Sequence, residues 1–564
     1  MTHVLTRLRS PLIAVALALV GTLLPGHRDT HSAWAASEIR ASFGPIQASI
    51  PLESLETYVD EGIIDEDLEP YIRYLSEDQV TELRTFLSTS IALDVDILTV
   101  SHFLYSDPGE VLLKRVGNIV RTRENNGFFA LRAAILLAAT DDQGFTPLNV
   151  IRQFPTDSLV LDFETGWGIA RDTQQAINQS ADAIALVRQQ FETALAANPP
   201  GPVPPRLSRP PALRYAWHVE RGGIPLKNRA FPVDVYLPQR ESPAPIIVIS
   251  HGLGSTVDSY QYLARHLVSS GFVVVVPEHE GSNAEHIQAL LQGKAEDVAE
   301  PREFINRAED ISLILTELIN QAETAPELIG RLDVDQIGVI GQSFGGYTAL
   351  ALGGATVHFD HLRDRCPTAE AIENGEDRSL NLSLLLQCRA LDLATTEAAE
   401  GAPPLETLSL HDERIDAILA INPIGSAIFG PDGFQSIDIP VLMMTGSADV
   451  IAPTLWEQIY PFSWLQTPEK FLVTMHRGTH FSTIGTSDED IPLPEAILGP
   501  VPQVAQRYVR AISLSFFQTY LNDAYGGNDA STTVQPLTPA YIDRLSRDPM
   551  PLSIIQDFDI DNLD

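Results

Sequence analysis

The run IGVIGQSFGGYTALAL, residues 337–352, decides the fold class of this chain. Its first four residues are typical of a short buried strand, and residues 347–352 are typical of a helix. Between them, GQSFG at 341–345 matches the pattern GxSxG, which holds a serine on a sharp strand-to-helix turn. The two flanking glycines let neighbouring backbone pack closely at such a turn. The bare pattern is weak evidence, but its place between a strand and a helix makes Ser343 a strong candidate nucleophile.

Further short apolar runs lie on both sides of this stretch. They are Ile246–Ile249, Phe272–Val276, Ala417–Ile421, Val441–Met444 and Phe471–Met475. They alternate with helical stretches, and continuous apolar strands between helices indicate a parallel sheet covered on both faces. We therefore predict an α/β fold, a doubly wound and mostly parallel sheet, over residues 212–525. In such sheets, functional residues gather in loops at the carboxyl ends of the strands.

A serine hydroxyl is a poor nucleophile at neutral pH, so Ser343 needs a base and a carboxylate that orients the base. His480 follows the last of the predicted strands, and Asp449 follows the strand before it. Taken singly, a histidine in a loop and an aspartate after a strand are usually surface or turn residues. Together they occur in the order serine, aspartate, histidine that this kind of sheet uses, so we predict a triad of Ser343, Asp449 and His480. His476 is the alternative base, disfavoured because it lies within or directly after the strand.

The negative charge that develops on a substrate oxygen needs two fixed hydrogen-bond donors. One is expected to be the backbone N–H of Phe344, the residue after the nucleophile. The second is expected from the loop His251–Gly254 after the first predicted strand, with the N–H of Leu253 as donor. The alternative is an ordinary glycine-rich turn with a core histidine.

These motifs together resemble the α/β-hydrolase superfamily over about Pro210 to Leu521. The HGLG segment at 251–254, GQSFGG at 341–346 and Pro277–His279 are similar to the plasma-type platelet-activating-factor acetylhydrolases. GSADVIAP at 446–453 and GTHF at 478–481 are similar to bacterial cutinases and polyester hydrolases. The second resemblance implies Asp449 and His480 as acid and base. The first implies an acid after the earlier strand, where this chain has Asn422, so Asp449 is preferred.

Residues 37–163 carry helical spacing and helix starts, so we predict a smaller all-α N-terminal domain. Ser76 with Gln79 fits a capping box, and Asp107 with Pro108 fits an N-cap and a first-turn proline. The run Phe128–Ala139 is apolar nearly all round, which predicts a buried helix. This domain resembles an uncharacterised domain found ahead of predicted hydrolases in cyanobacteria.

Four other segments complete the expected organisation. Residues 164–211 are expected to form a helix followed by a stiff linker, because seven prolines lie between Pro199 and Pro211. The segment 356–413 interrupts the sheet pattern and is expected as a lid over the acyl pocket or as a surface excursion. It holds Cys366 and Cys388, which form either a disulfide or two buried thiols. Residues 526–564 are expected as an acidic tail.

Residues 1–36 are typical of a secretory signal peptide. Arg7 and Arg9 precede an apolar run at Leu12–Leu24 and a small-x-small site at Ala33–Ala35. The alternative, a membrane anchor, is disfavoured because the run is shorter than the roughly 20 residues of a spanning helix. No later stretch is long and apolar enough to span a bilayer. We therefore expect export to the periplasm or the extracellular space.

The charge balance excludes some partners. Lys and Arg total 37 against 74 Asp and Glu, a formal net charge of -37. Such a charge repels phosphate backbones and anionic lipid surfaces, so nucleic acid is not an expected partner. The oligomeric state is left open.

These observations predict a secreted serine hydrolase that cleaves carboxylic esters through an acyl-enzyme, with a small-molecule or lipid ester as substrate. The mechanism requires no metal and no organic cofactor. Two alternatives remain: a lipid-directed hydrolase, either a phospholipid acetylhydrolase or a lipase, and a non-catalytic envelope-binding protein on a hydrolase scaffold.

Overall fold

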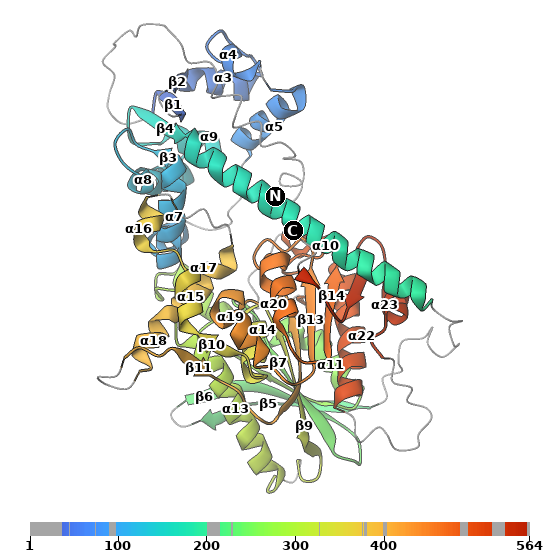
Figure 1. The fold of residues 1–564 in the computed structure, drawn as a ribbon. Helices are drawn as coiled ribbons and strands as arrows, with labels where there is room; N and C mark the ends of the chain where they lie inside the picture. Colours follow the sequence, from blue (N-terminus) through green and yellow to red (C-terminus); the bar gives the residue numbers. More distant parts are fainter. Residues whose placement is uncertain are drawn as a thin grey trace. The chain divides into compact units, whose positions relative to one another are not determined.

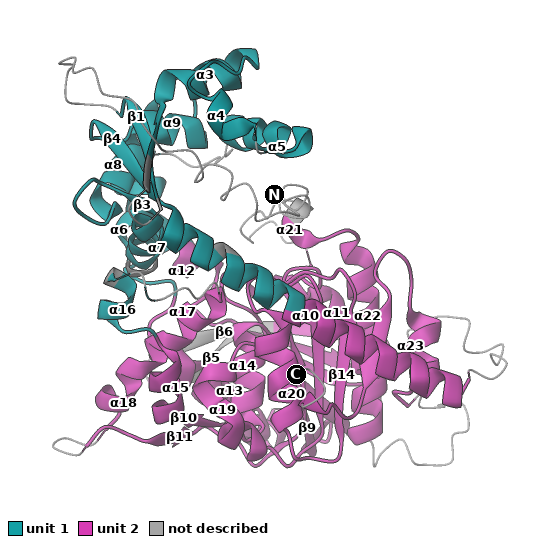
Figure 2. Ribbon diagram, turned by 45° about the horizontal axis from the view of Figure 1, so that its top comes forward, with its two compact units in different colours: residues 1–178, 288–298, 367–380 teal, residues 179–287, 299–366, 381–564 magenta. Residues whose placement is uncertain are grey.

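The computed structural model describes residues 36–43, 46–73, 75–89, 97–199, 215–226, 229–325, 328–374, 376, 381–398, 403–485, 495–521 and 536–560. The expected signal peptide and most of the proline-rich linker lie outside these residues. The chain divides into two compact units, coloured teal and magenta in Figure 2. Unit 1 holds residues 1–178, 288–298 and 367–380, and unit 2 holds 179–287, 299–366 and 381–564.

Unit 2 is built around a nine-stranded sheet in the order β15-β14-β13-β12-β9-β7-β8-β6-β5 (Figure 1). Its strands are β5 (Trp217–Leu226), β6 (Arg229–Pro238), β7 (Ala244–Ser250), β8 (Val273–Pro277), β9 (Leu332–Gln342), β12 (Ile415–Ile421), β13 (Val441–Gly446), β14 (Lys470–Met475) and β15 (Leu552–Ile555). The six central strands from β14 to β8 pair in parallel, and β5, β6 and β15 pair antiparallel at the two ends of the sheet. The predicted α/β architecture is confirmed.

The helices of unit 2 pack against both faces of this sheet (Figure 1). They are α11 (Gln261–Ser269), α12 (Ala284–Leu291, whose last residues belong to unit 1), α13 (Glu303–Ala322), α14 (Phe344–Leu352), α15 (Phe359–Arg365), α17 (Leu382–Cys388), α18 (Leu393–Thr396), α19 (Ser426–Gln435), α20 (Tyr460–Trp464), α21 (Glu495–Leu498), α22 (Pro502–Tyr520) and α23 (Pro539–Leu545), with the single turns η1 (Val257–Tyr260), η2 (Arg389–Asp392) and η3 (Leu455–Ile459). A two-stranded sheet of β10 (Thr356–His358) and β11 (Thr407–Ser409) closes the base of the excursion between β9 and β12.

Both faces of the large sheet are buried, which explains why the predicted runs within its central strands are apolar at nearly every position. In β7, Ile246 and Val248 pack in a cluster with helices α13 and α14, while Ile247 and Ile249 pack in another with α11 and α22. Successive side chains of a strand point to opposite faces, so a strand covered on both sides reads as a continuous apolar run. These runs bring the carboxyl ends of β7, β9, β12, β13 and β14 to one edge of the sheet.

Three strands of this sheet were not predicted. β5 and β6 form an antiparallel hairpin, and β15 adds Leu552–Ile555 beside β14. The described residues 536–560, expected as part of an acidic tail, instead contribute α23 and β15 to the unit. The reason is local: Leu552, Ser553, Ile554 and Ile555 are all buried, within an otherwise acidic stretch.

Unit 1 combines a sheet with helices. Its four-stranded sheet has the order β2-β1-β4-β3, with β1 (Glu38–Phe43), β2 (Ile46–Pro51), β3 (Val120–Arg121) and β4 (Ser158–Asp162). Its helices are α3 (Leu52–Glu61), α4 (Glu69–Ile72), α5 (Glu77–Ser88), α6 (Ile97–Tyr105), α7 (Asp107–Ile119), α8 (Phe128–Thr140), α9 (Pro147–Arg152), α16 (Ala369–Glu373) and the first part of α10 (Phe163–Ala197), which continues into unit 2.

The expectation of an all-α N-terminal domain is therefore wrong. Ile39 and Ala41 on one strand and Ala48 and Ile50 on the next are buried at every second position. This spacing is that of a half-buried strand rather than a helix. β1 pairs antiparallel with β2 and parallel with β4, a strand 120 residues further along the chain at its first paired residue.

The predicted helix signals of unit 1 have mixed outcomes. The capping box of Ser76 and Gln79 is confirmed, with both of its hydrogen bonds present. The N-cap of α7 is Ser106 rather than Asp107, because the Ser106 side chain accepts the N–H of Gly109. Helix α8 is not buried all round, since Phe129 is 76% exposed.

Within the described part of the chain, no helix is both apolar and long enough to cross a membrane.

Candidate active site

Ser343 sits on the sharp turn between β9 and α14. Its backbone has φ 56° and ψ -116°, a strained conformation for a residue with a side chain. A Cβ on Gly341 would lie 1.8 Å from the carbonyl oxygen of Gly345, so this approach requires glycine. A Cβ on Gly345 would lie 2.1 Å from the carbonyl oxygen of Ser250, at the end of β7. The glycines of GxSxG thus let the turn pack directly against the neighbouring strand.

The structure brings Ser343, His480 and Asp449 into one chain of hydrogen bonds. His480 Nε2 lies 2.8 Å from Ser343 Oγ, and His480 Nδ1 lies 2.7 Å from Asp449 Oδ2. All three residues are less than a tenth exposed. In this arrangement the imidazole can take a proton from the hydroxyl while the carboxylate holds its Nδ1–H.

The carboxylate of Asp449 is oriented by its own loop after β13. Its other oxygen, Oδ1, accepts the N–H groups of Ile451 at 2.9 Å and Ala452 at 2.8 Å. A carboxylate with both oxygens engaged has one orientation available, so Oδ2 is fixed toward the imidazole.

The loop that carries His480 is held by two amide side chains, which the sequence did not single out for this role. Asn422, directly after β12, donates to the carbonyl oxygens of Thr479 at 3.2 Å and His480 at 3.1 Å. Its side-chain oxygen accepts the N–H of Gly446 at 2.8 Å. Gln342 donates to the same His480 carbonyl at 3.2 Å. The sequence signal for Asn422 was its place at the end of a strand, where the acetylhydrolase resemblance implies an acid.

His476, the alternative base, does not contact Ser343. Its Nε2 lies 2.8 Å from the hydroxyl of Ser553 on β15, and its N–H bonds to the carbonyl of Pro551. It therefore joins the last two strands of the sheet.

The two expected oxyanion donors lie in segments that pack together. A Cβ on Gly252 would lie 2.3 Å from the Gln342 side-chain oxygen, so the loop at 251–254 runs beside the nucleophile turn. The N–H of Phe344 is in the first turn of a helix, where it has no intrahelical acceptor. Among the residues that the structure describes, no acceptor is bonded to the N–H of Phe344 or of Leu253.

Two histidines, one in this loop and one after β8, are buried and neutral. Burial, followed by the charge of Arg307, lowers the pKa of His251 to about 3. The same causes hold the pKa of His279 well below its usual value. His251 donates through Nδ1 to the carbonyl of Gly252 at 2.8 Å and accepts the N–H of His279 at Nε2 at 3.0 Å. These rings shape the loop and are not placed to serve as a base.

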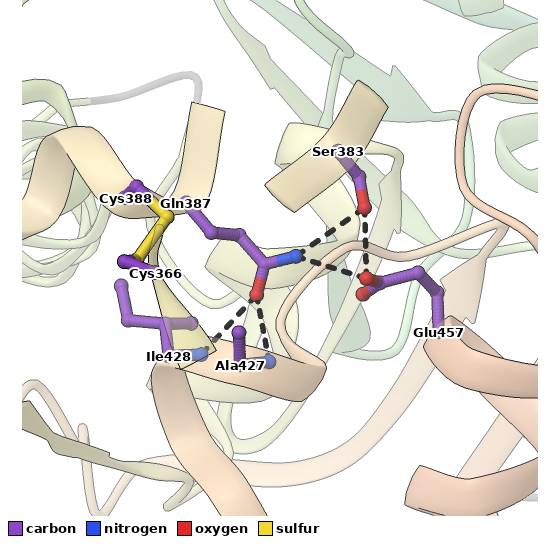
Figure 3. Close-up of a disulfide and its surroundings, with 7 residues drawn as sticks. All are labelled: Cys366, Ser383, Gln387, Cys388, Ala427, Ile428 and Glu457. Carbon is purple, nitrogen blue, oxygen red and sulfur yellow. Dashed lines mark hydrogen bonds between the residues drawn. A yellow bond between two sulfur atoms is a disulfide. The ribbon is translucent and has the colours of Figure 1, made fainter. Parts of the chain in front are cut away.

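The excursion between β10 and β11 is attached to the sheet unit at several points. Cys366 and Cys388 form a disulfide, which joins the residue directly after α15 to the last residue of α17 (Figure 3). Ser383 and Gln387 on α17 both bond to the buried carboxylate of Glu457, at 2.8 Å and 3.0 Å (Figure 3).

Glu457 also binds the segment after β12. Its carboxylate accepts the N–H groups of Gly425 and Ser426, both at 3.1 Å. Gln387 in turn accepts the N–H groups of Ala427 and Ile428 at the start of α19 (Figure 3). These bonds attach α17 to η3 and to the start of α19. The role of the excursion, as a lid or as a surface excursion, stays a prediction.

In the described ranges, no group of three or more His, Cys, Asp or Glu side chains is placed to hold a metal ion.

Comparisons with known proteins match two parts of the chain. A family described as alpha/beta hydrolase of unknown function (DUF1400) matches residues 35–162. A family described as platelet-activating factor acetylhydrolase, isoform II matches residues 232–318. The second match includes the loop at 251–254.

Curated relatives agree with the second match. A platelet-activating factor acetylhydrolase of Cavia porcellus is 29% identical over 135 residues, which cover 19% of this chain and 31% of that protein. A platelet-activating factor acetylhydrolase of Bos taurus is 27% identical over 137 residues, with the same coverage. The chain thus matches about a third of the length of these relatives. The fold and the family matches together identify the chain as similar to the α/β hydrolases.

Proposed function

We propose that this protein is a serine hydrolase that cleaves carboxylic esters through an acyl-enzyme. The observation that carries the proposal is the continuous hydrogen bonding from Ser343 through His480 to Asp449. The similarity to acetylhydrolases over residues 232–318 supports an ester as the substrate.

The reaction follows from the positions of these groups. Ser343 Oγ attacks the ester carbonyl carbon and gives its proton to His480 Nε2, while Asp449 stabilises the imidazolium. The carbonyl oxygen becomes negative and is stabilised by the N–H groups of Leu253 and Phe344. The alcohol leaves with the proton from His480. Water then attacks the acyl-enzyme with His480 as base, which releases the carboxylic acid and restores the serine.

A lipid ester is the second candidate substrate. The acetylhydrolase relatives favour it, and the net charge of -37 disfavours electrostatic binding to anionic membranes. The two candidates differ in one measurement: a lipid-directed enzyme gains activity when its substrate passes from monomers to an interface, and an esterase for soluble substrates does not.

We further propose that the protein acts outside the cytoplasm, in the periplasm or the extracellular space. The signal-peptide pattern at 1–36 supports this location. The Cys366–Cys388 disulfide also supports it, because such bonds persist in oxidising compartments.

The proposal is tested with the protein lacking residues 1–36 and its Ser343→Ala variant. The parent should hydrolyse p-nitrophenyl acetate and be labelled by a fluorophosphonate probe at Ser343. The variant should lose the label and at least about 10⁴-fold in kcat/KM. Ser513→Ala removes a buried serine hydroxyl in α22, far from β9 in sequence, and should retain both properties. Turnover by Ser343→Ala at the parental rate would refute the assignment, and a parent with neither turnover nor label would favour a non-catalytic binding protein.

A further inference from the structure

A buried arginine lies beneath the loop that carries the expected oxyanion donor. Arg307 on α13 is fully buried, and it is the largest of the fully buried side chains in the described residues. A charge without water costs free energy unless several partners surround it. The groups that bind the guanidinium of Arg307 therefore indicate the role of this buried charge.

Arg307 fixes the loop at 251–254 at its first residue. Its Nη1 donates to the carbonyl oxygen of His251 at 2.7 Å. That carbonyl belongs to the peptide that leads into Gly252 and Leu253. A hydrogen bond from a charged donor is roughly twice as strong as one between neutral groups, so this attachment is a firm one.

The same arginine fixes the loop at its last residue through Ser282. Arg307 Nε donates to Ser282 Oγ at 3.0 Å, and the carbonyl of Ser282 accepts the N–H of Gly254 at 2.8 Å. Ser282 Oγ donates onward to Glu303 at 2.8 Å. Leu253 thus lies between two residues, His251 and Gly254, whose backbone is held by one network.

Arg307 also contacts the second expected donor. Its guanidinium carbon lies 4.4 Å from the ring centroid of Phe344, within the range of a cation–π contact. One cation therefore touches the residue that follows the nucleophile and the loop that faces it, although the two segments are about 90 residues apart in sequence.

The guanidinium keeps its charge at neutral pH. Burial lowers the pKa of Arg307 to about 10, and the charges of Glu303, Glu278 and Asp310 act in the opposite direction. The adjacent rings of His251 and His279 are neutral because their pKa values are strongly lowered. A fixed positive charge in a dry site also favours negative charge nearby.

From these contacts we propose that Arg307 is the positioning residue of the oxyanion hole, which sets the N–H of Leu253 and of Phe344 at the spacing that a tetrahedral oxyanion requires. This inference rests on the proposed ester hydrolysis. Arg307 does not touch the reacting atoms. It acts through the His251 carbonyl, through Ser282 and through the Phe344 ring.

The competing explanation is that Arg307 only stabilises the fold. The two explanations predict different kinetics, since a purely structural residue does not separate kcat from KM.

The test uses Arg307→Met together with the double variant Arg307→Met/Glu303→Gln, which removes the carboxylate that the single change leaves without its cation. Arg307→Lys keeps the charge without the planar fork. Arg132→Met is the matched control: Arg132 is also buried, is paired with Glu110 and lies over the rings of Tyr105 and Phe128, but it belongs to unit 1. Thermal unfolding shows which variants are folded.

For each folded variant, kcat and KM are measured on p-nitrophenyl acetate. Binding is measured for a trifluoromethyl ketone, which forms a tetrahedral oxyanion on the serine, and for the matching methyl ketone, which stays trigonal. We expect the double variant to lose about 10- to 100-fold in kcat, less than the 10²- to 10³-fold lost when a donor is removed outright. KM should stay within about threefold. Affinity for the trifluoromethyl ketone should fall in parallel with kcat, affinity for the methyl ketone should not change, and Arg307→Lys should recover part of the loss.

Three outcomes would overturn the proposal. A folded double variant with the parental kcat and trifluoromethyl ketone affinity would show that Arg307 does not position the donors. An equal loss of kcat in Arg132→Met would show a general effect of destabilisation. A parent without ester turnover and without fluorophosphonate label would overturn the proposed function itself, and this inference with it, whereas an active parent with an unaffected variant overturns this inference alone.

Discussion

Replacing Asn422 by aspartate tests whether one side chain holds the loop of the proposed base. Asn422 is fully buried and its side chain makes three hydrogen bonds, two as a donor to the carbonyls of Thr479 and His480 and one as an acceptor from Gly446. An aspartate has the same shape and keeps the acceptor. It loses both donors while it is ionised, and its new oxygen then faces two carbonyl oxygens at 3.2 Å and 3.1 Å.

The size of the effect follows from these bonds. Each lost hydrogen bond costs about 1 kcal/mol, so the two donors together account for about 2 kcal/mol. A buried carboxylate that faces carbonyl oxygens adds a further penalty of about 1–3 kcal/mol, and the penalty raises the pKa of the new carboxyl group. If about 2 kcal/mol of this total is lost from the positioning of His480, kcat falls by about 30-fold.

The change also carries a pH signature. The new carboxyl group has a higher pKa in the folded protein than in the unfolded chain, so the folded state binds the proton more tightly. The deficit in free energy of unfolding relative to the parent should therefore be largest at neutral pH and should shrink as the pH falls through the raised pKa. Protonation restores one of the two donors. Asn422→Ala has no such group, so its deficit should not recover in this way.

The assay combines urea unfolding and the hydrolysis of p-nitrophenyl acetate between pH 5.5 and 8. Asn149→Asp is the matched control, because Asn149 is also buried and donates two side-chain hydrogen bonds, to Asp141 and Gly144, within unit 1. It should lower stability and leave kcat per folded molecule unchanged. The reasoning is refuted if Asn422→Asp unfolds at the parental urea concentration with the parental kcat, or if Asn422→Asp and Asn422→Ala show the same pH dependence.

Three further outcomes are expected. In steady-state kinetics, Asp449→Asn should lower kcat by about 10⁴-fold with little change in KM, because the imidazole of His480 loses the group that selects its tautomer. Retention of more than a tenth of the parental kcat would contradict the assignment of Asp449 as the acid. Glu457→Ala removes the acceptor of at least five hydrogen bonds in a buried site, so the free energy of unfolding measured with denaturant should fall by about 3–5 kcal/mol. A decrease below about 1 kcal/mol would show that α17 is not anchored at Glu457. The unfolded chain protonates His251 and His279 near pH 6.5, while the folded protein keeps both rings neutral to far lower pH. The free energy of unfolding should therefore fall as the pH decreases below about 6.5, by up to about 2.7 kcal/mol per pH unit for the pair, and a flat profile between pH 6.5 and 5 would contradict their buried, neutral state.

The central strands of the sheet could be predicted because each is apolar on both faces. Runs such as Phe272–Val276 fit a sheet covered by helices, and the predicted bounds agree with the structure to within two residues except in β9, which begins five residues earlier, at Leu332. The half-buried strands were missed for the opposite reason. β1 and β2 bury only alternate residues in a region rich in helix starts, which concealed their period of two. β15 was missed for another reason: its four buried residues form a short run within an acidic stretch.

The candidate site likewise has residues that the sequence predicts and residues that it does not. Ser343, Asp449 and His480 each follow a recognisable strand, so their order and spacing point to one edge of the sheet. Asn422 and Arg307 act on backbone carbonyls that lie more than 50 residues away in sequence. The local sequence around a buried asparagine or arginine does not predict such a partner, because the hydrogen bond to the distant carbonyl forms only in the folded sheet.

The antiparallel pairing of β15 with β14 has a consequence for how the protein is made. β14 leads directly into the loop of His480, and its outer edge pairs with Leu552–Ile555, which are synthesised about 80 residues later. Until that strand emerges, β14 presents unpaired N–H and carbonyl groups, an edge that invites pairing with other nascent chains. Completion of the imidazole-bearing side of the sheet is therefore coupled to the arrival of residue 555, and a chain that stalls before it would carry a finished nucleophile turn on an open, aggregation-prone sheet.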